Sequence, residues 1–188
     1  MTTAPAAPPA AFPITRGRTK GYETRAVDAF LNRARLSFEA GGEVVTAAEV
    51  RQVAFPLVRR GYVIAAVDTA LTRIEDAFAA RERDSAVARP GGARVWVGGA
   101  RESAQVVLDR LSRPKGSKFA RVGALRYGYR IDEVDLVAEK LGRYLAEGDP
   151  VTVDQVRNVA FRMQRGGYRE AQVDAVLDAV IEVMLAVA

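Results

Sequence analysis

Apolar residues recur at three- and four-residue intervals in three stretches of the chain, and each stretch follows a Gly-Tyr pair. This spacing places them on one side of a helix, because a helical turn contains 3.6 residues. Alternation of apolar and polar residues, which is typical of strands, is not sustained anywhere. The pattern predicts an all-α fold. The stripes are Val27, Phe30, Leu31 and Ala34, then Val67, Ala70, Leu71 and Ile74, then Val173, Val176, Leu177 and Val180.

Two shorter helices are predicted by threonines that precede apolar runs. Thr46 stands three residues before Glu49, and Thr152 stands three residues before Gln155. In such a capping box the threonine hydroxyl accepts a hydrogen bond from the third helical amide, and the longer side chain bonds back to the threonine amide. We expect each helix to end near the phenylalanine that precedes the next Gly-Tyr pair.

One motif occurs four times: Gly-Tyr, four residues, then Val-Asp. Its glycines stand at positions 21, 61, 128 and 167, so the intervals are 40, 67 and 39 residues. The alternation of short and long intervals indicates two pairs of copies rather than four equal units. Residues 45–71 and 151–177, aligned at an offset of 106, share 14 identities in 27 positions. The sequence therefore indicates internal duplication of a two-copy unit.

The duplication predicts two similar helical subdomains, each built from two helix-loop-helix copies. Pro-Gly and Gly-Gly steps between the pairs favour a linker there. An amphipathic helix should follow the linker, with Val107, Leu108 and Leu111 facing inward. The expected parts are a disordered arm at 1–11, a first pair of repeats at 12–83, a linker at 84–99, a bridging helix and basic loop at 100–118, and a second pair of repeats at 119–188.

The repeated residues are interpreted as scaffold. The glycine would supply a positive φ or a tight approach to the helix, the tyrosine ring would pack over the apolar stripe, and the valine would lie in the core. The aspartate would meet a helix N-terminus and nearby arginines. Four aspartates on four helices favour a structural role over metal binding or acid–base chemistry. The motif residues are Phe12, Gly21, Tyr22, Val27, Asp28, Phe55, Gly61, Tyr62, Val67, Asp68, Phe119, Gly128, Tyr129, Val134, Asp135, Phe161, Gly167, Tyr168, Val173 and Asp174.

Composition argues against several kinds of chemistry. The chain has no cysteine and no histidine, which removes thiolate nucleophiles, disulfides, histidine bases and almost every zinc site. It also has no glycine loop of the phosphate-binding type. We therefore expect a protein that is not an enzyme and has no cofactor, metal or small-molecule substrate. No apolar run reaches the roughly 18–20 residues that span a bilayer, and the Ala/Pro-rich start does not resemble a signal peptide, so a cytoplasmic location is expected.

Positive charge is concentrated in two segments of a chain whose formal net charge is +5. Residues 110–130 carry seven Lys or Arg and no acid, and residues 12–25 carry four Lys or Arg and one Glu. Such clusters attract anionic lipids, nucleic acids or acidic proteins, and an ordinary solvated loop is the alternative interpretation. The predicted contact residues are Arg16, Arg18, Lys20, Arg59, Arg60, Arg113, Lys115, Lys118, Arg121, Arg126, Tyr127, Arg130 and Arg165.

The recurring pattern of Phe, five residues, Gly-Tyr, four residues, Val-Asp, two residues and Leu resembles the N-terminal domain of DivIVA, the bacterial polar-targeting and cell-division protein. Residues 45–74 and 151–181 match it best, and residues 12–36 and 119–145 are looser copies. The whole chain resembles the actinobacterial DivIVA-domain repeat proteins. In DivIVA the loop before Gly-Tyr presents an aromatic residue followed by arginine to the membrane. Here Arg126-Tyr127 has both residue types in the reverse order.

The resemblance implies a non-enzymatic scaffold or interaction module linked to bacterial cell division or polar growth. It would bind a protein of that machinery, and it would contact the anionic inner face of the cell membrane electrostatically rather than by an inserted wedge. Heptads are not sustained, so pairing of copies within the chain would replace the family's coiled-coil dimer. The alternative is a nucleic-acid-binding protein that uses residues 110–130, although no known reading helix or RNA motif accompanies that segment.

Overall fold

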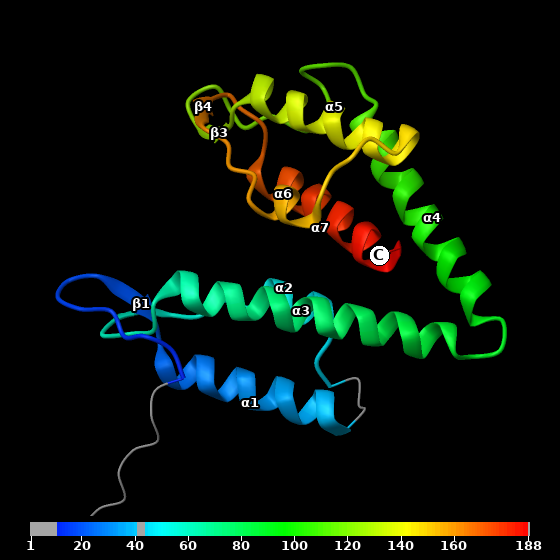
Figure 1. Cartoon of the computed structure of the whole chain (residues 1–188). Coiled ribbons are helices and arrows are strands. Elements are labelled where there is room, and N and C mark those ends of the chain that lie inside the picture. The colour runs from blue at the N-terminus through cyan, green and yellow to red at the C-terminus, as the bar shows by residue number, and fades with distance from the viewer. Residues whose placement is uncertain (1–10, 41–43, 188) are drawn as a thin grey trace, which may run out of the picture. The chain divides into compact units, whose positions relative to one another are not determined.

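Helices dominate the fold. The computed structural model describes residues 11–40 and 44–187, and the expected arm at 1–11 lies outside this range except for its last residue. The all-α prediction holds for the class of fold, but the sequence pattern does not predict the short strands. Within the described residues the elements are β1 (Lys20–Tyr22), α1 (Thr24–Ala40), α2 (Ala47–Gln52), β2 (Leu57–Arg59), α3 (Ile64–Val87), α4 (Gly92–Leu111), β3 (Tyr127–Tyr129), α5 (Ile131–Glu147), α6 (Val153–Arg157), β4 (Met163–Arg165) and α7 (Glu170–Val187) (Figure 1).

The chain divides into two compact units, Met1–Glu82 and Arg83–Ala188. The boundary falls within α3, whose last residues belong to the second unit. Each unit contains one two-stranded antiparallel sheet, β1–β2 in the first and β3–β4 in the second. Each sheet joins segments that lie about forty residues apart in the sequence, and each of those segments leads into a long helix.

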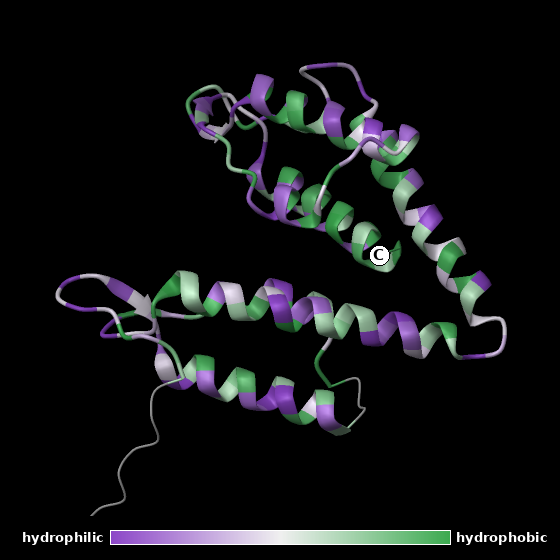
Figure 2. Cartoon of the chain, viewed as in Figure 1, coloured by the Kyte–Doolittle hydropathy of each residue, from purple (hydrophilic) through white to green (hydrophobic). Residues whose placement is uncertain are grey.

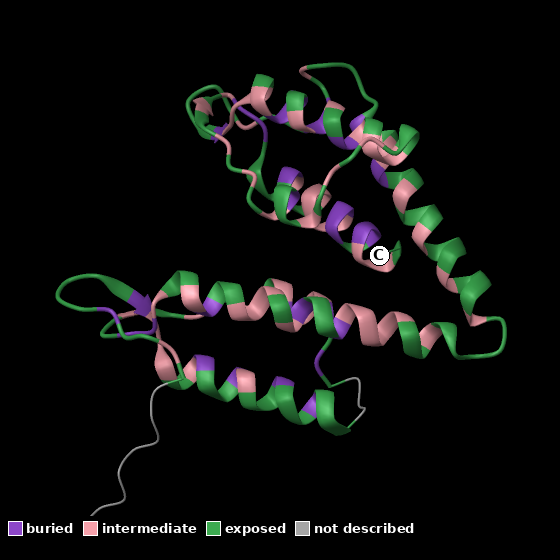
Figure 3. Ribbon diagram, in the orientation of Figure 1, coloured by how far each residue is buried: buried purple, intermediate pink, exposed green. Residues whose placement is uncertain are grey.

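The first unit buries one side of α1 against α2 and α3. The buried residues of α1 are Val27, Phe30, Ala34 and Ser37, which follow the apolar stripe that the sequence predicts. Figure 3 shows this alternation of buried and exposed positions along the helix. The core consists of two neighbouring groups: Phe30, Ala34, Val45, Ala47, Val50 and Phe78 in one, and Val27, Tyr62 and Val67 in the other.

The second unit is built around α7, which packs on α4 and α6, while α5 also packs on α4. Apolar residues run along most of α7 in Figure 2, and five of them are buried. Of the three residues expected to face inward on the bridging helix, Val107 and Leu111 are buried and Leu108 is half-buried. The core residues are Val107, Leu111, Phe119, Val134, Ala138, Leu141, Val156, Tyr168, Val173, Val180, Ile181 and Met184.

The segment expected to be a linker, residues 84–99, is mostly helical. α3 continues to Val87 and α4 begins at Gly92, not near residue 100. The turn between them uses Gly91 with a left-handed φ of 72°. Gly92 approaches α3 so closely that an added Cβ would lie 1.9 Å from the Ala86 carbonyl oxygen. The first glycines therefore mark one tight turn, whereas the later Gly-Gly step lies inside α4 although glycine is a weak helix former.

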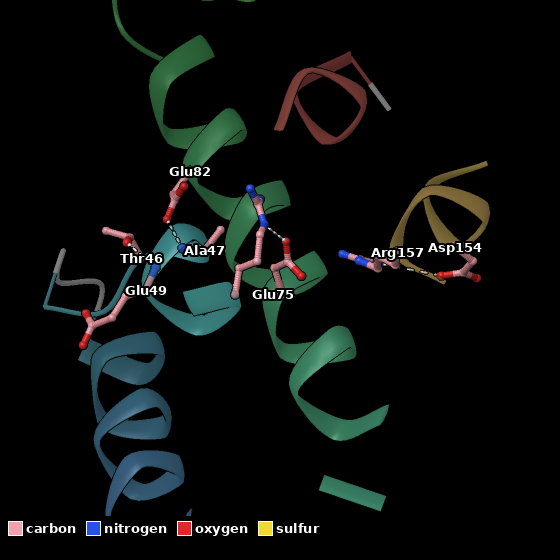
Figure 4. A network of polar contacts seen from close by, with 8 residues as sticks. Thr46, Ala47, Glu49, Glu75, Glu82, Asp154 and Arg157 are labelled. Atoms are coloured by element: carbon pink, nitrogen blue, oxygen red, sulfur yellow. Dashed lines mark hydrogen bonds and ion pairs between the residues drawn. The ribbon is translucent and has the colours of Figure 1, made fainter. Parts of the chain in front are cut away.

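The two predicted capping boxes have different outcomes. Thr152 forms a complete box, since its hydroxyl accepts from the Gln155 amide at 3.2 Å and Gln155 Oε1 accepts from the Thr152 amide at 3.3 Å. Thr46 caps α2 through the amide of Glu49 (Figure 4). The Glu49 carboxylate pairs with Arg33 of α1 instead of bonding back. Both short helices end before the phenylalanines, because the chain becomes extended before the second strand of each sheet.

Candidate functional site

The two Gly-Tyr segments of each unit lie antiparallel against each other. In the first unit the Tyr22 amide donates to the Tyr62 carbonyl at 3.0 Å, and the Tyr62 amide donates to the Tyr22 carbonyl at 2.8 Å. Tyr129 and Tyr168 exchange the same two bonds in the second unit, both at 2.9 Å. The repeated motif therefore joins two copies, because the backbone of each Gly-Tyr segment forms hydrogen bonds with the backbone of the other.

Close approach of the two backbones explains the glycines. An added Cβ on Gly21 would lie 2.1 Å from the Tyr62 carbonyl oxygen, and one on Gly61 would lie 2.4 Å from that of Tyr22. The second unit repeats the geometry at Gly128 and Gly167, with distances of 2.2 and 2.4 Å. None of these glycines has the positive φ that was one of the two expectations. Positive φ occurs one residue earlier, at Arg60 (56°) and Gly166 (64°).

Each tyrosine hydroxyl is directed to the aspartate of the other copy. Tyr62 donates to Asp28 Oδ1 at 3.0 Å, and Tyr168 donates to Asp135 Oδ1 at 2.9 Å. Burial raises the pKa of Tyr129 to about 12, with the Asp174 carboxylate as the next contribution. Burial and then Asp68 likewise raise the pKa of Tyr22. The partner of the repeated aspartate is thus a tyrosine hydroxyl, whereas the sequence suggested a helix N-terminus and nearby arginines.

The remaining motif residues fill the space around these pairs. Val27, Val67, Val134 and Val173 are buried, as expected, and so are Tyr62 and Tyr168. The phenylalanines also pack across copies, three of the four ring pairs edge to face, as such pairs prefer, and the Tyr129–Phe161 pair tilted at 51°. Ring centroids are 5.2 Å apart for Phe12–Tyr62 and 5.3 Å for Phe119–Tyr168, and 5.4 Å for Tyr22–Phe55 and 5.1 Å for Tyr129–Phe161.

The second unit encloses its aspartate more tightly than the first. Asp135 is buried and also accepts a 2.7 Å hydrogen bond from the Gly116 amide, which attaches the loop after α4 to α5. Burial raises the pKa of Tyr168 to about 12, and the hydrogen bond to Asp135 contributes.

Lys118 lies in the same cluster. It was predicted to contact an anionic surface, but it is only 3% exposed, and its ammonium donates to the Leu111 and Arg113 carbonyls. That prediction is wrong, because the lysine caps the end of α4.

Five predicted contact residues gather at one end of the first unit, which we name the first basic end: Arg16, Arg18, Lys20, Arg59 and Arg60. All five are exposed. No ion pair joins any of them to an acid within residues 11–40 and 44–187. Lys20 lies directly opposite Arg59 in the β1–β2 register. Like charges in this arrangement destabilise a strand pair, so the first basic end maintains a charge density that folding does not need.

The corresponding second basic end consists of Leu125, Arg126, Tyr127 and Arg165. Tyr127 is 56% exposed and lies opposite Arg165, whose guanidinium carbon is 5.8 Å from the ring centroid. Leu125 is 84% exposed. Arg126, Tyr127 and Arg165 were predicted from the sequence, but Leu125 was not, because an isolated leucine in a loop has no periodic signal. The second basic end thus includes an exposed aromatic ring and an exposed leucine, whereas the first is defined by five cations, with the exposed Ile14 and Leu57 close to them in the sequence.

The other cations of residues 110–130 do not form a continuous stripe. Lys115 pairs with Glu139 at 2.9 Å, and Arg130 pairs with Asp132 at 2.7 Å. Hydrogen bonds from these cations lower the pKa of the Glu139 and Asp132 carboxyls. Two further residues, Arg113 and Arg121, are exposed, and the Arg121 guanidinium donates to the Gly116 carbonyl at 3.0 Å. The density of charge in the sequence therefore overstates the charge available to a partner.

Sequence reasoning also missed a buried ion pair in the first unit. Arg51 Nε and Glu75 Oε1 are 2.7 Å apart, with side chains 10% and 5% exposed (Figure 4). The duplicated blocks share this arginine, and its counterpart Arg157 is also largely buried and lies near Asp154 in the second unit. The identity of Arg51 and Arg157 in the two duplicated blocks was the sequence signal that could have revealed these core arginines. Because a buried charge must be paired, both arginines belong to the cores and not to a binding surface.

Within the described part of the chain, no cluster of three His, Cys, Asp or Glu side chains could hold a metal ion. No helix there is long and apolar enough to cross a membrane. Comparisons with protein-family models, curated proteins and solved structures give no match. The candidate functional surfaces therefore rest on their own chemistry, and the two basic ends have the most distinctive chemical character.

Proposed function

We propose that the protein is a non-enzymatic scaffold of the DivIVA-domain repeat type, in which two duplicated subdomains each present a basic end to an anionic partner. The repeated motif supports this proposal because its glycines, tyrosines and aspartates are all used to join one copy to the next. The motif residues are thereby assigned to structure and not to catalysis. The role of the motif is to hold the strands in a fixed arrangement. The function is then assigned to the exposed residues of the two basic ends.

Lys20 facing Arg59 is the observation that carries the proposal. A directly opposed pair of like charges costs stability by up to about 1 kcal/mol, and a single acidic residue would remove that cost. An anionic partner accounts for both cations. Such a partner is the acidic-lipid surface of the inner membrane or an acidic face of a protein in division or polar growth. Each cation near an anionic bilayer contributes about 1 kcal/mol of attraction.

Lys20→Glu tests the proposal, because it has opposite effects on stability and on binding. The substitution places an acid opposite Arg59, so the free energy of unfolding should rise by about 0.2–1 kcal/mol. Co-sedimentation with anionic vesicles should nevertheless fall, and more steeply at low salt, where exposed charges are least screened. Neutral vesicles should bind neither form.

Arg73→Glu on α3 is the matched control, since it makes the same change in net charge at an exposed position of the same unit. Equal losses for both variants would show that only net charge matters and would contradict the proposal for this end. In cells, a fluorescent fusion should form polar or septal foci. Nucleoid staining would instead favour nucleic-acid binding, which the separation of the cations in residues 110–130 does not support.

A further inference from the structure

The first half of α4, residues 92–100, has few of the features that stabilise a helix. Gly92, Gly98 and Gly99 lie in it, together with Val95, Trp96 and Val97. Glycine is about 1 kcal/mol less favourable than alanine in a helix interior, and β-branched and aromatic residues are also weaker helix formers than alanine. The same helix has good formers in its second half. The first half therefore depends on contacts outside the helix to remain helical.

Although α4 packs on α7, no residue of 92–100 is fully buried. The buried residues of α4 are Val107 and Leu111, both in its second half. In the first half Val95 is 76% exposed and Val97 is 53% exposed. A Cβ added to Gly98 or Gly99 would meet no atom of the described residues within 4 Å. Apolar burial, which stabilises most helices in proteins, is thus concentrated away from residues 92–100.

Trp96 attaches this half of α4 to α7. Its side chain is partly buried, and its indole Nε1 donates a 2.8 Å hydrogen bond to the Ala186 carbonyl in the last turn of α7. Carbonyls in that position lack a partner within their own helix, so the bond satisfies an acceptor of α7 while it holds α4. One side chain therefore connects the weak half of one helix to the end of another.

We propose that residues 92–100 form a latch that opens locally while the rest of the second unit stays folded, with the Trp96–Ala186 contact holding it closed. The α3–α4 turn is not the point of opening, because Gly92 is packed against Ala86 there. Opening would begin at Gly98 and Gly99. Nine residues span about 14 Å as a helix and about 30 Å when extended, so the latch gives the chain between α3 and the second half of α4 two lengths.

Hydrogen exchange of the full-length chain tests the latch. Amides 96–100 have helical acceptors four residues earlier, so their protection reports on opening and not on a frayed end. They should exchange at least tenfold faster than amides 107–111 of the same helix. The double variant Gly98→Ala/Gly99→Ala should slow exchange at 96–100 by about 25-fold, since each glycine contributes about fivefold to the opening equilibrium.

Two further variants make the test specific. Trp96→Phe keeps an aromatic ring but removes the donor, and it should speed exchange at 96–100 without changing 107–111. Gly142→Ala in α5 is the matched control, because it is also a helix-interior glycine with open space around it. It should leave exchange at 96–100 unchanged. The proposal is overturned if wild-type amides 96–100 and 107–111 exchange at the same rate, or if the double glycine variant has no effect. If Trp96→Phe does not fold, the glycine variants still decide.

Discussion

At the scale of single residues, the repeated tyrosine is the centre of each unit. Tyr168 is fully buried, exchanges two backbone bonds with Tyr129, and donates its hydroxyl to Asp135 on the neighbouring copy. Tyr62 has the same relations to Tyr22 and Asp28, although Asp28 lies in a more exposed position. A copy on its own would leave its tyrosine and aspartate without these partners. The physical reason for repeating the motif is that it functions only in pairs.

Tyr168→Phe and Tyr62→Phe should have unequal effects on stability. Removing the Tyr168 hydroxyl leaves a buried carboxylate with one fewer donor, so we expect a loss of about 1.5–3 kcal/mol. Removing the Tyr62 hydroxyl should cost about 0.5–1 kcal/mol, because water can replace it at Asp28. Urea unfolding of the two variants measures the difference. Equal losses would contradict the link between burial of the aspartate and the strength of the pair.

Alkaline pH should weaken the fold through the same residues. The pKa values of Tyr129 and Tyr168 are raised to about 12, above the ordinary value of 10.0 that the unfolded chain has. The folded state thus holds these protons more tightly, and the stability that this provides is complete below pH 10. It is lost as the pH rises from 10 to about 12. Tyr168→Phe should flatten this decline in thermal unfolding, and an unchanged slope would contradict the assignment.

At the scale of elements, the sequence predicts the helices better than the contacts between copies. Helical stripes around Val27, Val67 and Val173 repeat often enough to be recognised. A three-residue strand has no period to detect, and its partner lies about forty residues away. Lys118 looked exposed because its neighbours in the sequence are basic, yet its long apolar stem lets it reach the end of α4. The sequence therefore could not predict which of the basic residues are paired.

Gly128→Ala tests whether close approach of the strands is what the repeated glycine provides. The added Cβ would lie 2.2 Å from the Tyr168 carbonyl oxygen, and backbone on both sides leaves little room for adjustment. We expect a loss of at least about 3 kcal/mol, consistent with strain in a packed site. Gly123→Ala is the control, because no described atom lies within 4 Å of its Cβ. Similar losses for the two variants in denaturant melts would refute this interpretation.

At the scale of the whole molecule, the chain has two units that each pair two Gly-Tyr copies in the same way, and the two units expose different sets of residues at their basic ends. The first basic end is defined by five cations, including Lys20 opposite Arg59. The second pairs Tyr127 with Arg165 beside the exposed Leu125. Under the proposed function, attachment is bivalent when both ends bind one anionic surface. The second contact is then intramolecular, and linking the two raises affinity well beyond that of either end alone.

Single and double substitutions distinguish bivalent attachment from two separate sites. Lys20→Glu weakens the first basic end, and Arg165→Glu weakens the second. If both ends bind one vesicle, each single variant should lose at least tenfold in apparent affinity for anionic vesicles, because avidity is lost with either end. Separate sites predict a loss of no more than about twofold for each single variant and a severe loss only for the double variant. Arg73→Glu again controls for net charge, and titration of vesicles at two salt concentrations compares the four variants with the wild type.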